Sequence, residues 1–331
     1  MKDGDAKLRW LSDFIICSIG CNIYINVAAF LLLDFITPAN GRFVMNKYKI
    51  EVIIPVYNNE DTIERCLKSL KAQTFSSWRA LIVDDASTDG SAAIVKKYAA
   101  EDDRFIYLRN EKNLGVARTR NKALSMLGSE YAAFLDADDV WEKDMLAALR
   151  GYAEKYDADV VQCRFVYDLP GGKQILPKGA FNENVLLEGK SLRRVYRRMM
   201  TGINMNHVCM KLIRSSLISG LRFDTDLKTA EDLDFCIRLF HNVKRYYFTT
   251  GILYHYYRGH TSLTGGGLSF SQKFSANRRV SRTLAKALPV WGIDDLFYRT
   301  LTYLRPYIII VSKAFRTIRE KVVAGAGKGK V

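Results

Sequence analysis

Cysteine is sparse and scattered in this chain of 331 residues. Of the six cysteines only Cys17 and Cys21 lie close together, and no two are spaced as CxxC. Structural zinc sites usually need such paired thiolates, so we do not expect a metal bound through cysteine. Cys66 and Cys236 fall on the apolar faces of expected helices, which indicates buried free thiols in a reducing compartment.

Other patterns that would define a class are also missing. No repeat of fixed period is visible, and no small-residue cleavage site marks a secretory signal. No zinc-finger, RNA-recognition or helix-turn-helix pattern accompanies the basic residues, so nucleic acid is not an expected partner. Residues 55–66 contain no glycine. This argues against a nucleotidyltransferase, which would carry a glycine-rich phosphate loop after its first strand.

Acidic residues are scarce at the carboxyl end. The net charge is +15, and from residue 270 onward thirteen basic residues face three acidic ones, so ten of the fifteen charges lie there. Apolar residues at roughly helical spacing lie among them: Tyr303, Leu304, Tyr307, Ile308, Ile310, Val311, Phe315, Ile318 and Val322. We expect residues 266–331 to form a basic amphipathic region, either a solvated tail or a helix on an anionic membrane surface.

The amino-terminal region allows two interpretations. Residues 14–33 carry no charge and are long enough to span a bilayer. Four small or polar residues weaken that interpretation: Ser18, Gly20, Asn22 and Asn26. Alternatively, translation starts at Met45, directly before the first strand. Residues 1–47 are therefore an extension or membrane segment whose nature stays open.

From residue 49 onward, strands and helices alternate. Strands are expected at residues 49–56, 80–83, 105–109, 131–135 and 159–167, and helices at residues 60–73, 87–101, 115–127 and 145–156. A hairpin, a helix near residues 188–200, a helix from Thr229 and strands at residues 244–248 and 252–257 follow. The alternation predicts an α/β fold, a Rossmann-like and mostly parallel sheet flanked by helices.

Acidic and polar side chains follow most of these strands, notably in the sequences Asp84-Asp85 and Asp136-Ala137-Asp138-Asp139. Ligands of such sheets bind beyond the carboxyl ends of the strands. Carboxylates that gather there repel one another, so a divalent cation is a natural partner. Taken singly, a DxD turn, a capped DDAS turn or the pair Glu231-Asp232 at a helix start could be only structural.

Five motifs occur together and in order: VIIPVYN, DDAS, NLG with RN, FLDADD and EDLDF. This combination resembles family 2 glycosyltransferases with the GT-A fold, of the bacterial cell-envelope type. The resemblance covers roughly residues 49–257. It implies a catalytic domain at residues 48–265, with a nucleotide-sugar half at about 48–140 and an acceptor half at about 141–265.

The resemblance also implies roles for single residues. Pro55, Tyr57, Asp85, Arg120, Asp136 and Asp138 match positions that bind the nucleotide-sugar, although Thr119 replaces the alanine that normally precedes the matching arginine. Asp138 and Asp139 match the metal ligands, and Asp232 matches the general base. Glu231 and Lys211 fall on the acceptor side. Arg258 or His260 could contact the diphosphate, unless their segment is only a surface loop.

The family's chemistry is an inverting transfer from a nucleotide-sugar, usually a UDP-sugar, with Mn or Mg as cofactor. By analogy the acceptor is a glycan or a lipid-linked glycan, reached from the cytoplasmic face of the plasma membrane. A non-enzymatic binding protein derived from the same fold is the remaining alternative. The intact DxD and Glu-Asp motifs argue against it, because a degenerate copy could lose either.

Overall fold

The computed structural model describes residues 48–201, 204–258 and 268–308. The described residues belong to one compact unit, Tyr48–Val331. The segment at residues 14–33 and His260 lie outside them, as does the end of the basic carboxyl region. Within the parts that are described, no helix is both long and apolar enough to cross a membrane.

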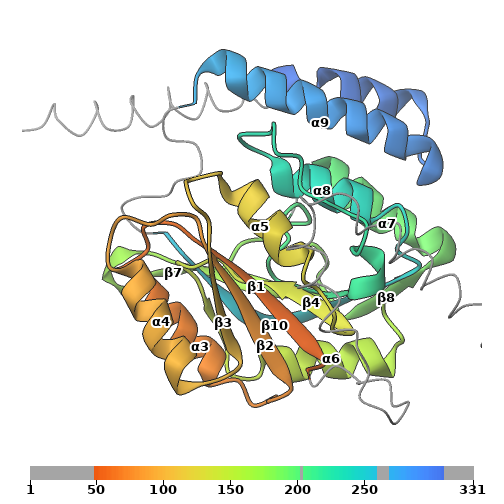
Figure 1. The fold of residues 1–331 in the computed structure, drawn as a ribbon. Helices are drawn as coiled ribbons and strands as arrows, with labels where there is room; N and C mark the ends of the chain where they lie inside the picture. Colours follow the sequence, from red (N-terminus) through yellow and green to blue (C-terminus); the bar gives the residue numbers. More distant parts are fainter. Residues whose placement is uncertain (1–47, 202–203, 259–267, 309–331) are drawn as a thin grey trace, which may run out of the picture. The chain divides into compact units, whose positions relative to one another are not determined.

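A mixed sheet forms the centre of this unit (Figure 1). Among the described residues its strand order is β3-β2-β1-β4-β9-β6-β10-β5, with β7 paired to β6 and β8 to β10. The first four strands in this order are parallel, whereas β9 runs antiparallel to both β4 and β6. The strands are β1 (Ile50–Val56), β2 (Trp78–Asp84), β3 (Phe105–Arg109), β4 (Tyr131–Phe134), β5 (Val140–Trp141), β6 (Val160–Asp168), β7 (Gln174–Ile175), β8 (Val185–Glu188), β9 (Lys211–Arg214) and β10 (Arg245–Tyr257).

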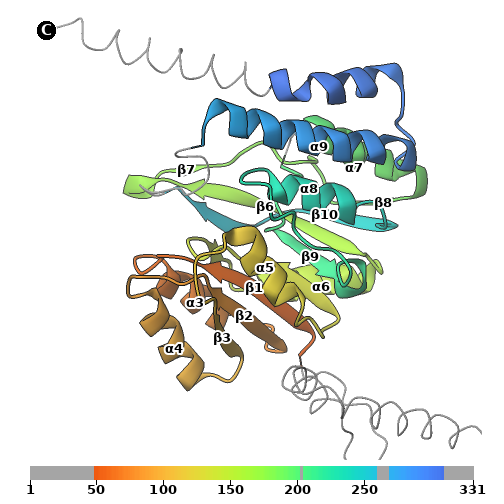
Figure 2. The ribbon, with the colours of Figure 1, turned by 45° about the horizontal axis from the view of Figure 1, so that its top comes forward.

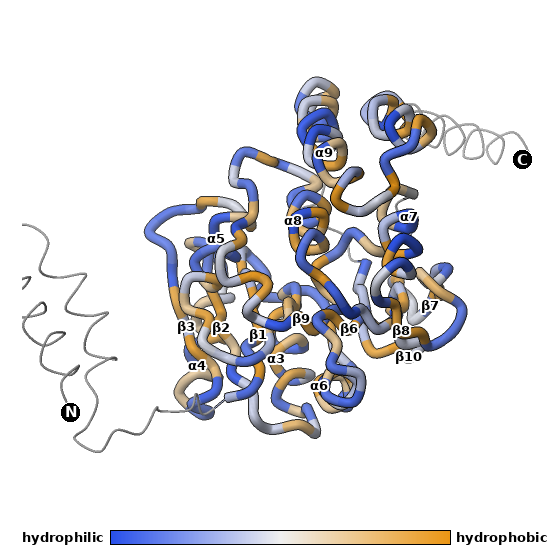
Figure 3. Tube along the Cα trace, turned by 90° about the vertical axis from the view of Figure 1, so that its right-hand side faces the viewer, coloured by the Kyte–Doolittle hydropathy of each residue, from blue (hydrophilic) through white to orange (hydrophobic). Residues whose placement is uncertain are grey.

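Helices cover both faces of the sheet. They are α3 (Ile63–Lys71), α4 (Ser91–Glu101), α5 (Val116–Leu124), α6 (Met145–Lys155), α7 (Arg193–Thr201) and α8 (Glu231–Leu239), and α9 (Phe270–Val290) lies further out. Figure 3 shows α3, α4 and α6 on one face and α5, α7 and α8 on the other. Because both faces are covered, the parallel strands are almost continuously apolar, as in the sequence IEVIIPV of β1.

A third layer lies outside α7 and α8. It consists of α9 and a further helical stretch at residues 296–308 (Figure 2). Its contacts include the ring of Trp291, which stacks on Tyr196 of α7 at 4.6 Å, and a hydrogen bond of 2.7 Å that Thr283 donates to Asp234 of α8. The catalytic-domain boundary expected at residue 265 stays a prediction. Helix α9, which follows that position, belongs to the same compact unit as the sheet.

The expected α/β architecture is confirmed, and the helical carboxyl end with it. Two details were wrong. The strands expected at residues 244–248 and 252–257 are one strand, β10, whose register against β6 shifts between Phe248 and Ile252. The short strands β5, β8 and β9 were not expected, because two to four residues are too few to display a period. Cys66 and Cys236 are buried free thiols, as expected.

Candidate active site

The carboxyl ends of the parallel strands carry most of the predicted site residues. Pro55 and Tyr57 are half-buried at the end of β1, and Asp84 and Asp85 end β2. The DADD sequence begins two residues after the end of β4, with Leu135 between them. The strands β2, β1 and β4 are neighbours in the sheet, so their ends meet at one edge, which is where an open α/β sheet binds its ligands.

Asp85 is nearly enclosed. Its side chain is 3% exposed, and its carboxylate accepts hydrogen bonds from the backbone amides of Leu114 and Gly115 and from the side chain of Asn110. These bonds hold the loop that leads into α5. Asp85 therefore fixes the conformation of that loop, and its capacity to accept a further hydrogen bond is small.

Asp84 is a structural carboxylate. It is fully buried and accepts hydrogen bonds from the Ser87 amide, the Tyr107 hydroxyl and the Arg109 guanidinium, at 2.8, 2.8 and 2.6 Å. Both of its carboxylate oxygens have a partner, as a buried carboxylate requires. The Asp-Asp pair after β2 thus ties two adjacent strand ends together.

The three carboxylates after β4 differ in their surroundings. Asp139 is 1% exposed and accepts hydrogen bonds from the Tyr254 hydroxyl and the Tyr257 amide. Burial and the charges of Asp136 and Asp138 raise the pKa of Asp139 well above its usual range. No described residue outside its own backbone donates to the carboxylate of Asp138, and burial together with Asp136 raises its pKa to about 6.

Arg120 of α5 connects this edge to α8. It is 4% exposed, and its two terminal nitrogens donate to Asp136 at 2.9 Å and to Asp232 at 2.7 Å. Glu231 lies 3.7 Å from the same guanidinium. One buried cation therefore balances three carboxylates, drawn from the end of β4 and from the first turn of α8.

The two carboxylates of α8 are partly covered, with side chains 15% and 19% exposed for Glu231 and Asp232. Burial and the charge of Asp232 raise the pKa of Glu231, while Arg120 opposes the rise. Asp232 also accepts a long hydrogen bond, 3.4 Å, from the amide of Val208. The Asp232 carboxylate is therefore held from two sides, by Arg120 of α5 and by the loop that precedes β9.

Strained backbone surrounds the site. Ala230, directly before the Glu-Asp pair, has φ +63°, Ala86 after Asp85 has φ +62°, and Asn58 after Tyr57 has φ +50°. Non-glycine residues rarely adopt this left-handed conformation, and they do so mostly where the surrounding structure needs it. Sequence reasoning missed this feature, because an alanine does not reveal the sign of its φ.

Lys211 lies deeper than an acceptor-side residue would. It is fully buried in β9, its ammonium donates to the backbone carbonyls of Met205 and His207, and burial lowers its pKa. Those carbonyls belong to the segment that also offers the Val208 amide to Asp232. Lys211 can therefore support the acceptor side from beneath, without reaching its surface.

One residue near Asp138 was not predicted. Arg65 of α3 donates to the backbone carbonyl of Asp138 at 2.8 Å and stacks on the ring of Tyr257 at 3.7 Å. Arg258, which was predicted, is exposed and lies 3.9 Å from the ring of Tyr167, and within the described part of the chain it pairs with no carboxylate of the site. The motif comparison could not find Arg65, because it lies on a helix between two motifs.

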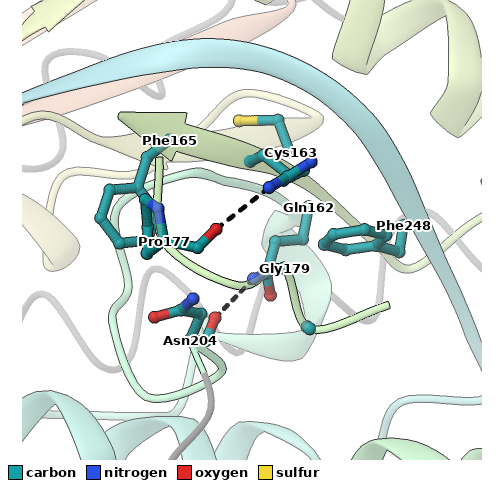
Figure 4. A pocket seen from close by; sticks show the side chains of 9 residues that line it. Gln162, Cys163, Phe165, Pro177, Gly179, Asn204 and Phe248 are labelled. Atoms are coloured by element: carbon teal, nitrogen blue, oxygen red, sulfur yellow. Dashed lines mark hydrogen bonds between the residues drawn. The ribbon is translucent and has the colours of Figure 1, made fainter. Parts of the chain in front are cut away.

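A small hollow lies elsewhere, between β6 and the segment that precedes β8 (Figure 4). Gln162, Arg164 and Asn204 contribute its polar atoms, and Arg164 and Gln162 are bonded to the carbonyls of Pro177 and Asn204. None of the predicted site residues lines it. We assign the chemistry to the edge of the sheet, where the carboxylates and Arg120 meet.

Solved structures with a similar fold define the class. Residues 1–349 of TarS from S. aureus match with a TM-score of 0.61 and 22% identity, over 77% of this chain and 72% of that one. The mannosyltransferase PcManGT from Pyrobaculum calidifontis, solved with GDP-Man and Mn²⁺, matches with a TM-score of 0.53 and 19% identity, over 86% and 76%. The fold is that of GT-A glycosyltransferases.

The sequence defines the family. The model of glycosyl transferase family 2 matches residues 51–221, just over half of the chain, and the chain belongs to that family. The cholesterol galactosyltransferase of Borreliella burgdorferi is 28% identical over 302 residues, 87% of this chain and 82% of that protein. For other curated relatives the matched part is as little as 16% of their length. Glu231 and Asp232 lie beyond the end of the family match.

Proposed function

We propose that this protein is an inverting glycosyltransferase that moves a sugar from a nucleotide diphosphate sugar to an acceptor hydroxyl. The observation that carries the proposal is Arg120, which bonds to Asp136 at the donor edge and to Asp232 at the start of α8. A transferase needs its donor site and its base within one sugar's reach, and a single guanidinium joins them here.

Asp232 is the proposed general base. It would accept the proton of the acceptor hydroxyl while that oxygen attacks the anomeric carbon, and the nucleoside diphosphate would leave from the opposite side. Its bonds to Arg120 and Val208 orient the carboxylate. A single displacement of this kind inverts the anomeric configuration, since no enzyme carboxylate forms a covalent intermediate with the sugar.

A divalent ion fits Asp138 better than Asp139. The carboxylate of Asp138 is half-buried without a donor from another described residue, whereas Asp139 accepts from both Tyr254 and Tyr257. No group of three ligand side chains occurs within the described residues. Mg²⁺ and Mn²⁺ often bind through one or two carboxylates plus substrate phosphates. The ion would offset the charge of the departing diphosphate.

A UDP-sugar is the proposed donor. Pro55, Tyr57 and the loop held by Asp85 lie where a nucleotide would bind at the edge of the sheet, and Arg258 offers an exposed cation near its rim. TarS, which shares the fold, was solved with UDP-GlcNAc and with UDP. PcManGT was solved with Mn²⁺. The TarS complexes support a nucleotide-sugar donor, and the PcManGT complex supports a divalent metal ion.

The proposed acceptor is a cell-surface polysaccharide or glycolipid. The matched galactosyltransferase of Borreliella burgdorferi is named for a lipid acceptor. A basic carboxyl end, with ten of the net positive charges, would suit work at the anionic inner face of the plasma membrane. The proposed location is therefore cytoplasmic and membrane-associated.

The test is release of UDP from a panel of UDP-sugars by the purified protein in the presence of Mn²⁺. Asp232→Asn should lower kcat by about 10²–10⁴-fold, the usual contribution of a general base, with the donor KM changed little. Asp226→Asn, an exposed carboxylate, is the matched control. Failure of the wild-type protein to bind any nucleotide with Mn²⁺ present would refute the proposal.

A further inference from the structure

The helix at residues 296–308 has two unlike sides. Thr302 is buried, and Arg305 donates to the backbone carbonyl of Met200, so this side packs on α7. The other side is apolar and turned to solvent: Leu296, Phe297 and Tyr303 are 81%, 67% and 73% exposed. Leu304, Tyr307 and Ile308 continue the stripe at intervals of three or four residues, with exposures of 41%, 52% and 46%.

A soluble helix normally turns its apolar stripe toward the core. Here the stripe points outward, although single exposed apolar side chains are common on any protein. Six large apolar side chains on thirteen consecutive residues form a continuous patch, and such patches mark interaction sites. Tyrosine at two of the positions is typical of a membrane–water interface, because the ring is apolar and the hydroxyl stays wet.

A basic stripe accompanies the apolar one. Arg278, Arg282 and Lys286 of α9 are exposed and four residues apart, opposite the buried Val280 and Leu284. Across residues 48–201, 204–258 and 268–308 these three cations make no ion pair. Their neighbour Arg279 differs, since it pairs with Asp224 at 2.6 Å.

The two stripes belong to one surface. The ring of Phe274 in α9 meets that of Tyr307 at 5.3 Å, and Figure 2 shows the two helices side by side as the outermost layer. Both stripes lie on the sides turned away from α7 and α8. We propose that this outer face, defined by the apolar stripe at residues 296–308 and by the three cations of α9, binds an anionic lipid bilayer.

Charge and polarity argue for lipid as the occupant. Unpaired arginine and lysine next to aromatic and aliphatic side chains match a surface with phosphate headgroups above acyl chains. This outer face is the surface by which the proposed transferase would contact the membrane. The proposal rests on the proposed function only for the choice of the inner face of the plasma membrane. Because Thr283 of α9 bonds to Asp234, two positions from Asp232, the lipid-binding layer is attached to the helix that carries the proposed base.

The experiment is co-sedimentation of the full-length protein with vesicles of phosphatidylcholine alone or with 30% phosphatidylglycerol, at two salt concentrations (~50 and ~300 mM). Wild type should bind the anionic vesicles and lose affinity as salt rises. Arg278→Gln, Arg282→Gln and Lys286→Gln combined should weaken binding about a hundredfold, because each charge near an anionic surface contributes about fivefold. Leu296→Ser, Phe297→Ser and Tyr303→Ser combined should weaken it at least tenfold.

Matched controls use exposed side chains elsewhere. Lys97→Gln, Lys143→Gln and Lys190→Gln remove the same charge, and Ile175→Ser with Leu176→Ser remove apolar side chains that are 43% and 49% exposed. Both should bind vesicles as the wild type does. Wild-type-like binding by the two stripe variants overturns the proposal and assigns any membrane contact to another part of the chain.

Two further readouts separate the alternatives. Sedimentation velocity tests a second copy of this chain as the occupant: a dimer that the apolar variant dissociates, with vesicle binding unchanged, also overturns the proposal. UDP release without vesicles should be the same in wild type and in both stripe variants. If the wild type releases no UDP, this contradicts the proposed function but does not affect the proposal of a lipid-binding surface.

Discussion

The guanidinium of Arg120 donates a hydrogen bond of 2.7 Å to the carboxylate of Asp232, which lies 112 positions later in the chain. The other terminal nitrogen bonds to Asp136. The donor edge of the sheet and the first turn of α8 are therefore joined through one side chain that is 4% exposed. Four predictions follow from this arrangement and from the carboxylates around it.

Replacement of Arg120 by lysine should separate positioning from charge. Lysine keeps the cation but cannot donate to Asp136 and Asp232 in the same fork geometry. We expect Arg120→Lys to lower kcat by about tenfold to a hundredfold, and Arg120→Met to cost about 3–5 kcal/mol of stability because buried carboxylates lose their partner. Arg118→Lys, an exposed change on the same helix, is the control. Steady-state kinetics and urea unfolding measure both effects, and an Arg120→Lys enzyme with normal kcat would contradict the positioning role.

Glu231 should make stability depend on pH. Burial and Asp232 raise its pKa to about 7 in the folded state, above an ordinary value near 4.5. The folded state therefore holds this proton more tightly, so the contribution of Glu231 to stability falls as pH rises from about 4.5 to 7. At pH 8 the free energy of unfolding of Glu231→Gln in urea should exceed that of the wild type by about 2 kcal/mol. This difference should vanish near pH 4.5. An equal difference at both pH values would contradict the shift.

Asp138 and Asp139 should respond differently to the loss of charge. Asp138→Asn should weaken Mn²⁺-dependent binding of UDP at least tenfold without destabilising the fold, since no side chain of the described residues bonds to its carboxylate. Asp139→Asn should instead destabilise the fold by about 1–3 kcal/mol, because the amide keeps only one acceptor oxygen and either the Tyr254 hydroxyl or the Tyr257 amide loses its buried acceptor. Calorimetric titration with and without EDTA measures binding, and thermal unfolding measures stability. Metal loss without destabilisation in Asp139→Asn would make Asp139 a direct ligand after all.

Replacing Ala230 by glycine should stabilise the protein. Its φ of +63° is unfavourable for any residue with a Cβ, and glycine removes that cost. We expect Ala230→Gly to stabilise the protein by about 0.5–1 kcal/mol, whereas Ala148→Gly within α6 should destabilise it by about 1 kcal/mol. Urea unfolding measures both. The same result for the two variants would show that the left-handed conformation carries no strain.

Local patterns were sufficient for the elements and for the list of candidate residues. The apolar run rich in β-branched residues in β1 depends on neighbours in the sequence, and so does the helical spacing of Ile63, Cys66, Leu67 and Leu70 in α3. Both elements appear where they were expected. The strand of two residues, β5, and the joined strand β10 could not be predicted in this way. Their pairing is decided by residues far along the chain, such as Trp141 opposite Tyr254.

The sequence by itself determined a parallel α/β sheet, acidic strand ends and a family resemblance, because periodicity and motif order are properties of the chain alone. Tertiary structure decided which carboxylates are held by hydrogen bonds and which are available to a ligand. Asp138 and Asp139 are adjacent and chemically identical, yet Tyr254 and Tyr257 occupy one and leave the other available. The same holds for Lys211, which the sheet buries, and for Arg120, whose partners lie in the segment after β4 and in α8. Burial and hydrogen-bond partners come from packing between distant segments, and no local pattern contains them.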